Sequence, residues 1–294
     1  MSSRRISSLR GAALALVLTA AADYGAAQQP HPALDLHPGA APAPAPPPPI
    51  AEISPGLAYG YLADAALPDS LALLPPPPAE GSAALAADRE SNQAKRALQG
   101  SKRWRLAGMD ANLSFPWAAG DFACALNALV NPLDTSHLYR LLRRSMTDAI
   151  QSARAAKDHY KRPRPFLLNQ APTCTPGAEA RLSAEGSYPS EHAAAGWTWA
   201  LILAEISPEQ SEAILARGRA FGESRVVCNA HWPSDVEAGS SLGAAVVARL
   251  HADPAFFADV DAAKTELAAV RARKLPPQRD CKFEADAMAQ QPAP

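Results

Sequence analysis

Apolar side chains recur at steps of three and four residues along the middle of the chain. Between residue 133 and about residue 157, this spacing puts five of them on one helix face: Leu138, Leu142, Met146, Ala149 and Ala153. The pattern predicts an amphipathic helix that packs against a core, with Lys157 near its end. The following Arg162-Pro-Arg164-Pro165 is expected to be extended, because each proline disfavours helix in the residue before it.

Four more helices are predicted in the second half of the chain, and they begin at Ser190, Ser207, Pro233 and Pro254. The first should run to about residue 206 and the last to about residue 271. Small residues on one side of the helix from Pro233, among them Ser240 and Gly243, would permit a close approach to a neighbouring helix.

The first half of the chain predicts fewer helices. A proline run at residues 75–78 precedes a segment from Ser82 to about Leu98 that contains no helix breaker. A second apolar segment covers residues 115–130 and ends at the turn Asn131-Pro132. Strand patterns are nearly absent, so the predicted fold class is all-α, with one helical domain.

Both ends of the chain differ in composition from this domain. Residues 1–27 are typical of a signal peptide, with Arg4, Arg5 and Arg10 before a short apolar run and small residues at 25–27. A membrane anchor is the alternative, but the apolar run is shorter than the ~20 residues that cross a bilayer. Residues 28–56 are rich in Pro and Ala and should be extended and mostly disordered. The predicted domain covers residues 57–272, and residues 273–294 form a Pro-rich tail that should fray unless Cys281 holds it.

Charge and composition limit the classes of partner that the chain is expected to bind. The formal net charge is −1 at pH 7, and aromatic residues make up 6% of the sequence. The sequence has no basic patch and no interleaved aromatic residues, so it does not suggest nucleic-acid binding. After residue 27 no segment is long and apolar enough to span a membrane, so no membrane contact is expected once residues 1–27 are removed. The sequence leaves the oligomeric state open, including a homo-oligomer.

The cysteine content fits an exported protein. The four cysteines are Cys124, Cys174, Cys228 and Cys281. An even number after an export signal favours two disulfides, for which three pairings are possible, with free buried thiols as the alternative. None has the close spacing of a zinc site.

The strongest chemical signal is the stretch from residue 222 to residue 239. In it Arg225 offers a planar fork of donors suited to phosphate oxygens. Asp235 follows His231 by four residues and can hold one imidazole nitrogen, which leaves the other free as a nucleophile. Taken alone, such a His–Asp pair is more often a structural contact.

Two further stretches give the pair its context. Lys157 is followed seven residues later by Arg164-Pro165, and Pro189-Ser190-Glu191-His192 lies between this stretch and the Arg225 segment. The order K-x6-R-P, P-S-x-H, S-R-x5-H-x3-D resembles the three-part signature of the superfamily of type 2 phosphatidic acid phosphatases and vanadium haloperoxidases. The residues around the motifs are most similar to bacterial class A non-specific acid phosphatases, from about residue 57 to about residue 267.

The resemblance implies a helical bundle of the acid phosphatase/vanadium haloperoxidase type, with the site between its central helices. By this resemblance His231 is the nucleophile and becomes a phosphohistidine. Asp235 orients His231, and His192 donates a proton to the leaving group. Phosphate binding would fall to Lys157, Arg164, Ser190, Glu191 and Arg225, with Glu191 contributing its backbone N–H between Ser and His of the second motif. No metal or other cofactor is implied. His159 and Lys161 would be supporting or solvated residues, and a solvated basic face around Arg162 is the alternative for Lys157 and Arg164.

The cysteines and Glu191 add two further expectations. The loops carrying Cys174 and Cys228 should converge on the site, which favours a Cys174–Cys228 disulfide and leaves Cys124–Cys281. The family usually has Gly where this chain has Glu191, and a carboxylate there would repel phosphate unless it points away or pairs with a basic residue.

The predicted function is that of a periplasmic or secreted enzyme, a non-specific acid phosphatase acting on phosphate monoesters. The sequence does not separate hydrolysis from phosphotransfer to another alcohol. A vanadate-dependent haloperoxidase is one alternative, because vanadate mimics the phosphoryl transition state. A phosphate-binding protein impaired by Glu191 is the other.

Overall fold

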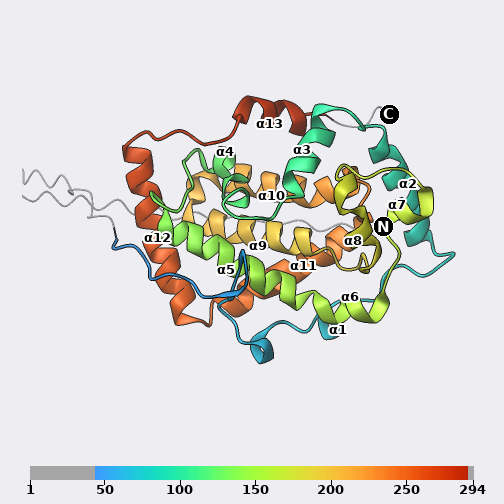
Figure 1. Cartoon of the computed structure of the whole chain (residues 1–294), viewed down its shortest axis with the longest axis horizontal. Coiled ribbons are helices and arrows are strands. Elements are labelled where there is room, and N and C mark those ends of the chain that lie inside the picture. Colours follow the sequence, from blue (N-terminus) through green and yellow to red (C-terminus); the bar gives the residue numbers. More distant parts are fainter. Residues whose placement is uncertain (1–43, 291–294) are drawn as a thin grey trace, which may run out of the picture. The chain divides into compact units, whose positions relative to one another are not determined.

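The computed structural model describes residues 44–290 (Figure 1). The predicted signal peptide, most of the Pro- and Ala-rich segment and the last four residues of the tail lie outside this range. Within it the chain is built from helices, which confirms the predicted all-α class. The strands of this range are β1 (Glu52–Ser54) and β2 (Leu57–Ala58), which form one short antiparallel pair.

Helix α9 (Glu191–Ile206) is the centre of the bundle. It packs along α10 (Ser211–Val227), α11 (Pro233–Leu250) and α5 (Ser136–Ser152), and α12 (Pro254–Ala272) crosses their far ends (Figure 1). Trp199 of α9 is fully buried and meets Phe122 and Phe221 edge to face. Because α9 is apolar on all sides, it is stable only when other helices surround it.

Shorter helices cover this core. Along the chain they are α1 (Ser70–Leu73), α2 (Ala83–Arg96), α3 (Lys102–Asp110), α4 (Ala123–Leu126), α6 (Arg154–Tyr160), α7 (Pro165–Asn169), α8 (Glu179–Ser183) and α13 (Cys281–Met288). Single 3₁₀ turns occur at Asp64–Ala66, Ala118–Gly120, Pro176–Ala178 and Pro208–Gln210.

Two glycines bring α11 unusually close to α9. A Cβ atom added at Gly239 would lie 2.3 Å from the Ser190 carbonyl oxygen, and one at Gly243 would lie 2.6 Å from that of Ala194. Any larger residue would push the helices apart. The close approach holds the beginnings of the two helices side by side, and those beginnings carry the second and third motifs.

The structure departs from the sequence expectation in three places. The helix expected from 133 to 157 is two helices that meet at Ala153, next to Ser152, whose hydroxyl donates to the Asp148 carbonyl and competes with helical bonding. Helix α3 was not predicted, because its nine residues carry too few apolar side chains to show a period. Residues 44–56 are not free: the extended chain lies along α5, where Arg140 donates to the Pro48 carbonyl at 2.9 Å and Arg143 to Glu52 at 2.6 Å.

Two disulfides form, between Cys124 and Cys281 and between Cys174 and Cys228. The first joins α4 to the start of α13 across 157 residues of sequence. The tail, expected to fray unless Cys281 held it, is therefore anchored at Cys281 and helical over Cys281–Met288. The second links the loop before α8 to the end of α10, close to His231.

Candidate active site

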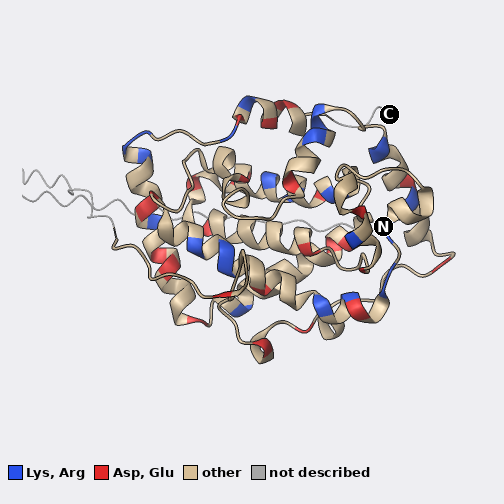
Figure 2. Ribbon diagram, viewed as in Figure 1, with Lys and Arg blue, Asp and Glu red and all other residues tan. Residues whose placement is uncertain are grey.

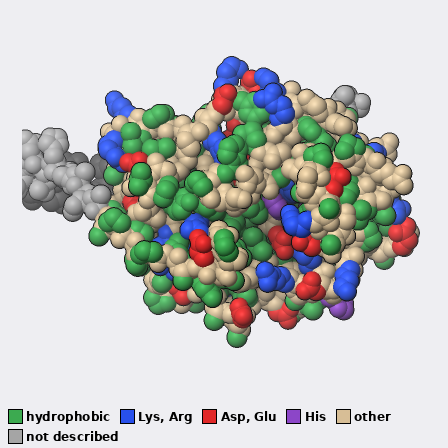
Figure 3. All heavy atoms as spheres, viewed as in Figure 1, with side chains coloured by type: hydrophobic (Ala, Val, Ile, Leu, Met, Phe, Trp, Pro, Cys, Tyr) green, Lys and Arg blue, Asp and Glu red, His purple; other side chains and the backbone are tan. Residues whose placement is uncertain are grey.

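The three predicted motifs meet at one end of the bundle. Lys157 lies in the last turn of α6, Arg164 directly precedes α7, Ser190 caps α9 and His231 stands two residues before α11. The Ser190 amide donates to the Asp235 carbonyl at 3.0 Å, which ties the α9 and α11 beginnings together. On the face in Figure 3, a histidine side chain is recessed between basic and acidic ones. Elsewhere on the ribbon the two charge signs are interspersed (Figure 2).

The His231 imidazole is held between a guanidinium and a carboxylate. Nη1 of Arg164 lies 2.9 Å from Nε2, and Oδ2 of Asp235 lies 3.4 Å from Nδ1, a contact that does not meet hydrogen-bond geometry and leaves Nδ1 without a partner among residues 44–290. Because a guanidinium can only donate, Nε2 must present its lone pair, and the proton of the neutral ring is on Nδ1, facing Asp235. Burial and the charges of Arg164, Lys157 and Arg225 keep the pKa of His231 well below its ordinary value. The neutral ring with a basic Nε2 is the form a nucleophile needs.

Asp235 is itself firmly fixed. Its carboxylate is fully buried and accepts from the Trp232 amide at 2.9 Å and from Nη1 of Arg162 at 2.6 Å. Burial raises the pKa of Asp235, while Arg162 and the Trp232 amide act in the opposite direction. Arg162 binds Oδ1 and the Trp232 amide binds Oδ2, the oxygen that faces His231, so both oxygens are fixed and the carboxylate can orient His231 without moving.

Arg162 bridges two buried carboxylates. Its second nitrogen donates to Asp88 of α2 at 2.7 Å, and Asp88 also accepts from the Ser234 amide at 2.9 Å, in the first turn of α11. Arg162 and Asp88 are 7% and 4% exposed, so neither belongs to a solvated face. They carry no assigned role in the sequence motifs, although the extended backbone puts Arg162 and Arg164 on the same side.

Three more cationic groups are buried around His231. Nζ of Lys157 donates to the carbonyls of Gly186 and Pro189, and Nε of Arg164 donates to that of Leu182 at 2.9 Å. Nε and Nη1 of Arg225 have no hydrogen-bond partner among residues 44–290, although Arg225 is 1% exposed. Burial, followed by the charge of Arg164, lowers the pKa of Arg225 to about 9. Buried cationic donors that lack a protein partner are suited to bind an anion.

Ser190 and its helix add neutral donors to this cationic cluster. Its Oγ accepts from the Ala193 amide at 3.2 Å as the cap of α9, which leaves its own hydroxyl proton for another acceptor. The sixteen-residue helix that starts there directs its first amides and the positive end of its dipole into the same space.

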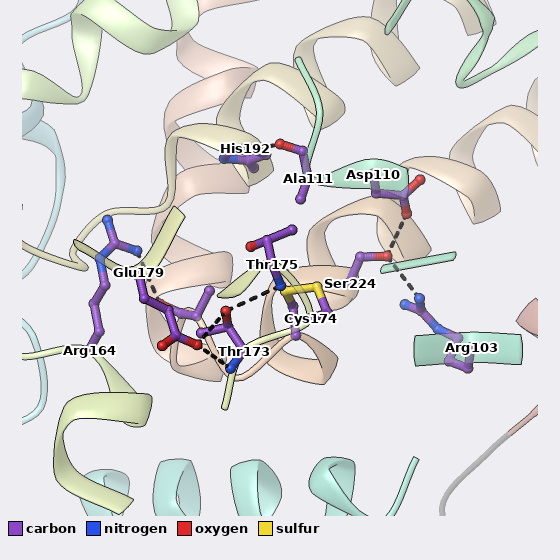
Figure 4. The surroundings of a disulfide bond; sticks show 12 residues. Arg103, Asp110, Ala111, Arg164, Thr173, Cys174, Thr175, Glu179, His192 and Ser224 are labelled. Atoms are coloured by element: carbon purple, nitrogen blue, oxygen red, sulfur yellow. Dashed lines mark hydrogen bonds between the residues drawn. A yellow bond between two sulfur atoms is a disulfide. The ribbon is translucent and has the colours of Figure 1, made fainter. Parts of the chain in front are cut away.

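His192 is oriented by backbone rather than by a carboxylate. Its Nε2 lies 3.1 Å from the carbonyl oxygen of Ala111, at the end of α3 (Figure 4). A carbonyl only accepts, so Nε2 carries a proton and Nδ1 is the atom available for proton exchange. Burial, Arg225, His231 and Arg164 lower the pKa of His192 well below its ordinary value, and only the Ala111 carbonyl acts against them.

Ser224, the first residue of the third motif, points away from this group. Its hydroxyl donates to Asp110 at 2.5 Å and accepts from Arg103 at 2.8 Å (Figure 4). Asp110 also pairs with the buried Arg217. This network fixes the end of α3, and with it the Ala111 carbonyl that contacts His192.

Comparison with known proteins identifies the family. Residues 141–257 match the PAP2 superfamily. An acid phosphatase of Zymomonas mobilis is 40% identical over 220 residues, which are 74% of this chain and 83% of that protein. Non-specific acid phosphatases of Providencia stuartii and Salmonella typhimurium are also 40% identical, over 72% and 66% of this chain and 86% and 78% of their own lengths.

The chain belongs to the bacterial class A non-specific acid phosphatases.

In this acid phosphatase the structure brings all eight predicted site residues to one place, while His159 and Lys161 are exposed. The motifs did not predict Arg162 and the Ala111 carbonyl, which contact Asp235 and His192, or Asp88, which pairs with Arg162. In residues 44–290, no cluster of three His, Cys, Asp or Glu side chains could hold a metal ion. Over the same range, no helix has both the length and the apolar character needed to cross a bilayer.

Glu191, the departure from the family pattern, faces a cation. Its Oε2 lies 3.9 Å from Nζ of Lys157, and its side chain is 23% exposed. The carboxylate therefore neither points into open solvent nor makes a close ion pair. It lowers the positive potential of the site without occupying a donor.

Replacing Arg162 should test how far the orientation of His231 depends on it. Arg162→Lys keeps the charge but cannot bridge Asp235 and Asp88 in one plane. We expect kcat to fall about 10- to 100-fold with a small change in KM, as for other groups that orient a catalytic ligand. Initial-rate kinetics measure both constants, and a circular-dichroism melt checks the fold. The exposed neighbour variant Lys161→Gln is the control; an unchanged kcat in Arg162→Lys would contradict the assignment.

Replacing Glu191 should test its electrostatic effect. Glu191→Gln keeps the size of the side chain and removes the charge, so KM for a phosphate monoester should fall about three- to tenfold. The effect should shrink at high salt because screening weakens partly exposed charges. Glu212→Gln, at the exposed far end of α10, is the matched control. Equal KM values for Glu191→Gln and the wild type would show that the carboxylate does not act on the substrate.

Proposed function

We propose that this acid phosphatase hydrolyses phosphate monoesters through a covalent phosphohistidine at Nε2 of His231. The observation that carries the proposal is the orientation of that ring: Nδ1 faces Asp235, and the lone pair of Nε2 faces the cationic cluster of Lys157, Arg164 and Arg225. The unpartnered donors of Arg225 support a phosphoryl group as the ligand of this cluster.

In the first step the phosphoryl oxygens contact the three cationic side chains, the Ser190 hydroxyl and the first amides of α9. Nε2 of His231 attacks phosphorus as the bond to the ester oxygen breaks. His192 gives that oxygen a proton from Nδ1, so that the alcohol leaves neutral, while its Nε2–H stays on the Ala111 carbonyl. The positive charge that develops on the His231 ring is stabilised by Asp235.

In the second step water attacks phosphorus and the P–N bond breaks. His192 is now neutral at Nδ1 and takes the proton of the water, which returns both histidines to their starting states. Another alcohol in place of water would give phosphotransfer by the same route.

We further propose that the enzyme acts outside the cytoplasm, in the periplasm or as a secreted protein. The signal-like residues 1–27 and two disulfides support this location, because disulfides persist in oxidising compartments. The relatives are named acid phosphatases, which favours phosphatase activity over a vanadate-dependent haloperoxidase or a phosphate-binding protein.

Trapping of the intermediate tests the nucleophile. Rapid quenching into alkali, in which phosphohistidine survives, should recover labelled phosphate on His231 by peptide mapping. His231→Ala should lose the label and nearly all turnover, about 10⁴-fold or more, whereas Asp235→Asn should lose less because it misorients the ring without removing it. Assays in EDTA keep the test free of adventitious metal, because the proposed steps use none. Wild-type turnover by His231→Ala would refute the mechanism.

The pH dependence tests the proton donor. In the free enzyme burial and Arg225 hold the pKa of His192 low, so kcat/KM should already decline in the acidic range. Bound phosphate dianion stabilises the imidazolium and raises the pKa of His192, so the alkaline limb of kcat should lie at higher pH than that of kcat/KM. Profiles from about pH 4 to pH 8 give both limbs. His192→Ala should abolish the alkaline limb of kcat; a limb that persists unchanged would exclude His192 as its source.

A further inference from the structure

The described chain begins with an N-terminal arm, residues 44–56, which lies along α5 (Figure 1). Residues 46–49 of the arm are four consecutive prolines, which have no N–H to donate. This part of the arm can therefore be held by hydrogen bonds only through its carbonyl groups, which need donors from the domain. Arg140 supplies one donor to the Pro48 carbonyl, and the ring of His137 faces the carbonyl of Ala45.

His137, in the first turn of α5, has an acceptor at each ring nitrogen. Nδ1 lies 2.9 Å from Oδ1 of Asp259 in α12, and Nε2 lies 2.9 Å from the carbonyl oxygen of Ala45 in the arm. A neutral imidazole has a single N–H and can donate to only one of them, whereas the imidazolium donates to both. In the neutral ring the proton remains with the carboxylate, the stronger acceptor, and the Nε2 lone pair faces the carbonyl oxygen. Deprotonation therefore turns the contact between His137 and the arm from attractive to repulsive.

The groups around the ring favour its charged form. Glu266 of α12 accepts from the backbone amide of His137 at 3.0 Å, which offsets the positive end of the α5 dipole. Asp259 is fixed by two further donors, Nε of Arg140 at 2.9 Å and the Tyr61 hydroxyl at 2.6 Å. The charged or titratable groups that face the ring are thus Asp259 and Glu266 of α12, Arg140 of α5, and Tyr61.

These surroundings set the pH range in which the contact holds. Burial acts against the charged ring, but the hydrogen bonds to Ala45 and Asp259 and the charge of Glu266 outweigh it and raise the pKa of His137. Protonation of His137 and docking of the arm therefore stabilise each other. This stabilisation is complete below about pH 6.5, the ordinary pKa of imidazole, and it is lost as the pH rises through the higher pKa of the folded state.

The other attachments of the arm do not titrate over this range. Arg140 and Arg143 hold the Pro48 carbonyl and the Glu52 carboxylate through guanidinium groups, which stay charged. The hydrogen bond from Arg143 lowers the pKa of Glu52, the single charged residue of the arm, so Glu52 is ionised throughout. Loss of the His137 proton therefore frees the beginning of the arm and leaves the remainder attached.

We propose that His137 is a pH-dependent clasp for the N-terminal arm: the protonated ring fastens the start of the arm to α5 and α12, and the neutral ring releases it. The start of the arm is thus fixed under acidic conditions and free at higher pH, while the helical domain stays unchanged.

A spin label measures this release directly. Ala45 is exposed and the four cysteines are joined in disulfides, so Ala45→Cys provides a single site for a nitroxide. Between about pH 5 and about pH 8 the ratio of immobile to mobile label should fall about tenfold, as expected for one hydrogen bond to a charged group. The midpoint should coincide with the titration of the His137 ring, measured by NMR.

Two substitutions of His137 separate its charge from its presence. His137→Lys keeps a positive donor at every pH, so the label should stay immobile; His137→Gln is neutral at every pH, so the label should stay mobile. His251→Gln is the matched control, because the ring of His251 also lies between a carbonyl and a carboxylate, those of Val247 and Glu205. This control should keep the wild-type transition.

A wild-type spectrum that does not change with pH, or a transition that persists in His137→Gln, would overturn the clasp. Circular-dichroism melts check that each variant is folded. The measurement uses no substrate, so its outcome is independent of the proposed phosphatase mechanism.

Discussion

The architecture of the active site depends on one electrostatic constraint: four cationic side chains are buried at the same end of the bundle. Lys157, Arg162, Arg164 and Arg225 are each at most 7% exposed. Buried charge is tolerated only when it is paired or hydrogen-bonded. Asp235 and Asp88 balance Arg162, and backbone carbonyls solvate Lys157 and Arg164. Arg225 keeps two unpartnered donors, so the positive charge is only partly compensated before an anion binds. An anion that binds the folded chain would therefore also stabilise it.

Much of the fold could be read from helix-starting residues. Ser190, Pro233 and Pro254 begin, or directly precede, helices α9, α11 and α12, because caps and first-turn prolines act locally. The site residues could be placed because their spacing along the chain forms a known pattern. Arg162 and Asp88 could not, because their roles come from a contact across 74 residues of sequence. The same holds for Ala111, whose function lies in its carbonyl and leaves no trace in its side chain.

The two histidines are oriented in different ways. The difference determines which mutations would disturb the orientation of each ring. His231 depends on side chains, Asp235 and then Arg162, any of which a point mutation can remove. His192 depends on the Ala111 carbonyl, which every amino acid possesses. Its position is instead sensitive to the path of the backbone at the end of α3. That path is fixed at a distance by Asp110, Ser224 and Arg217.

Glu191 gives the site a property that concerns the end of the catalytic cycle. In the proposed mechanism inorganic phosphate would make the same contacts as the phosphoryl group of the substrate, so a cluster of this charge would hold its product. A carboxylate 3.9 Å from Nζ of Lys157 repels the departing dianion as well as the arriving ester. In the proposed mechanism Glu191 would therefore exchange some affinity for faster release of product. This suits a catalyst that must keep working as the phosphate it liberates accumulates around it.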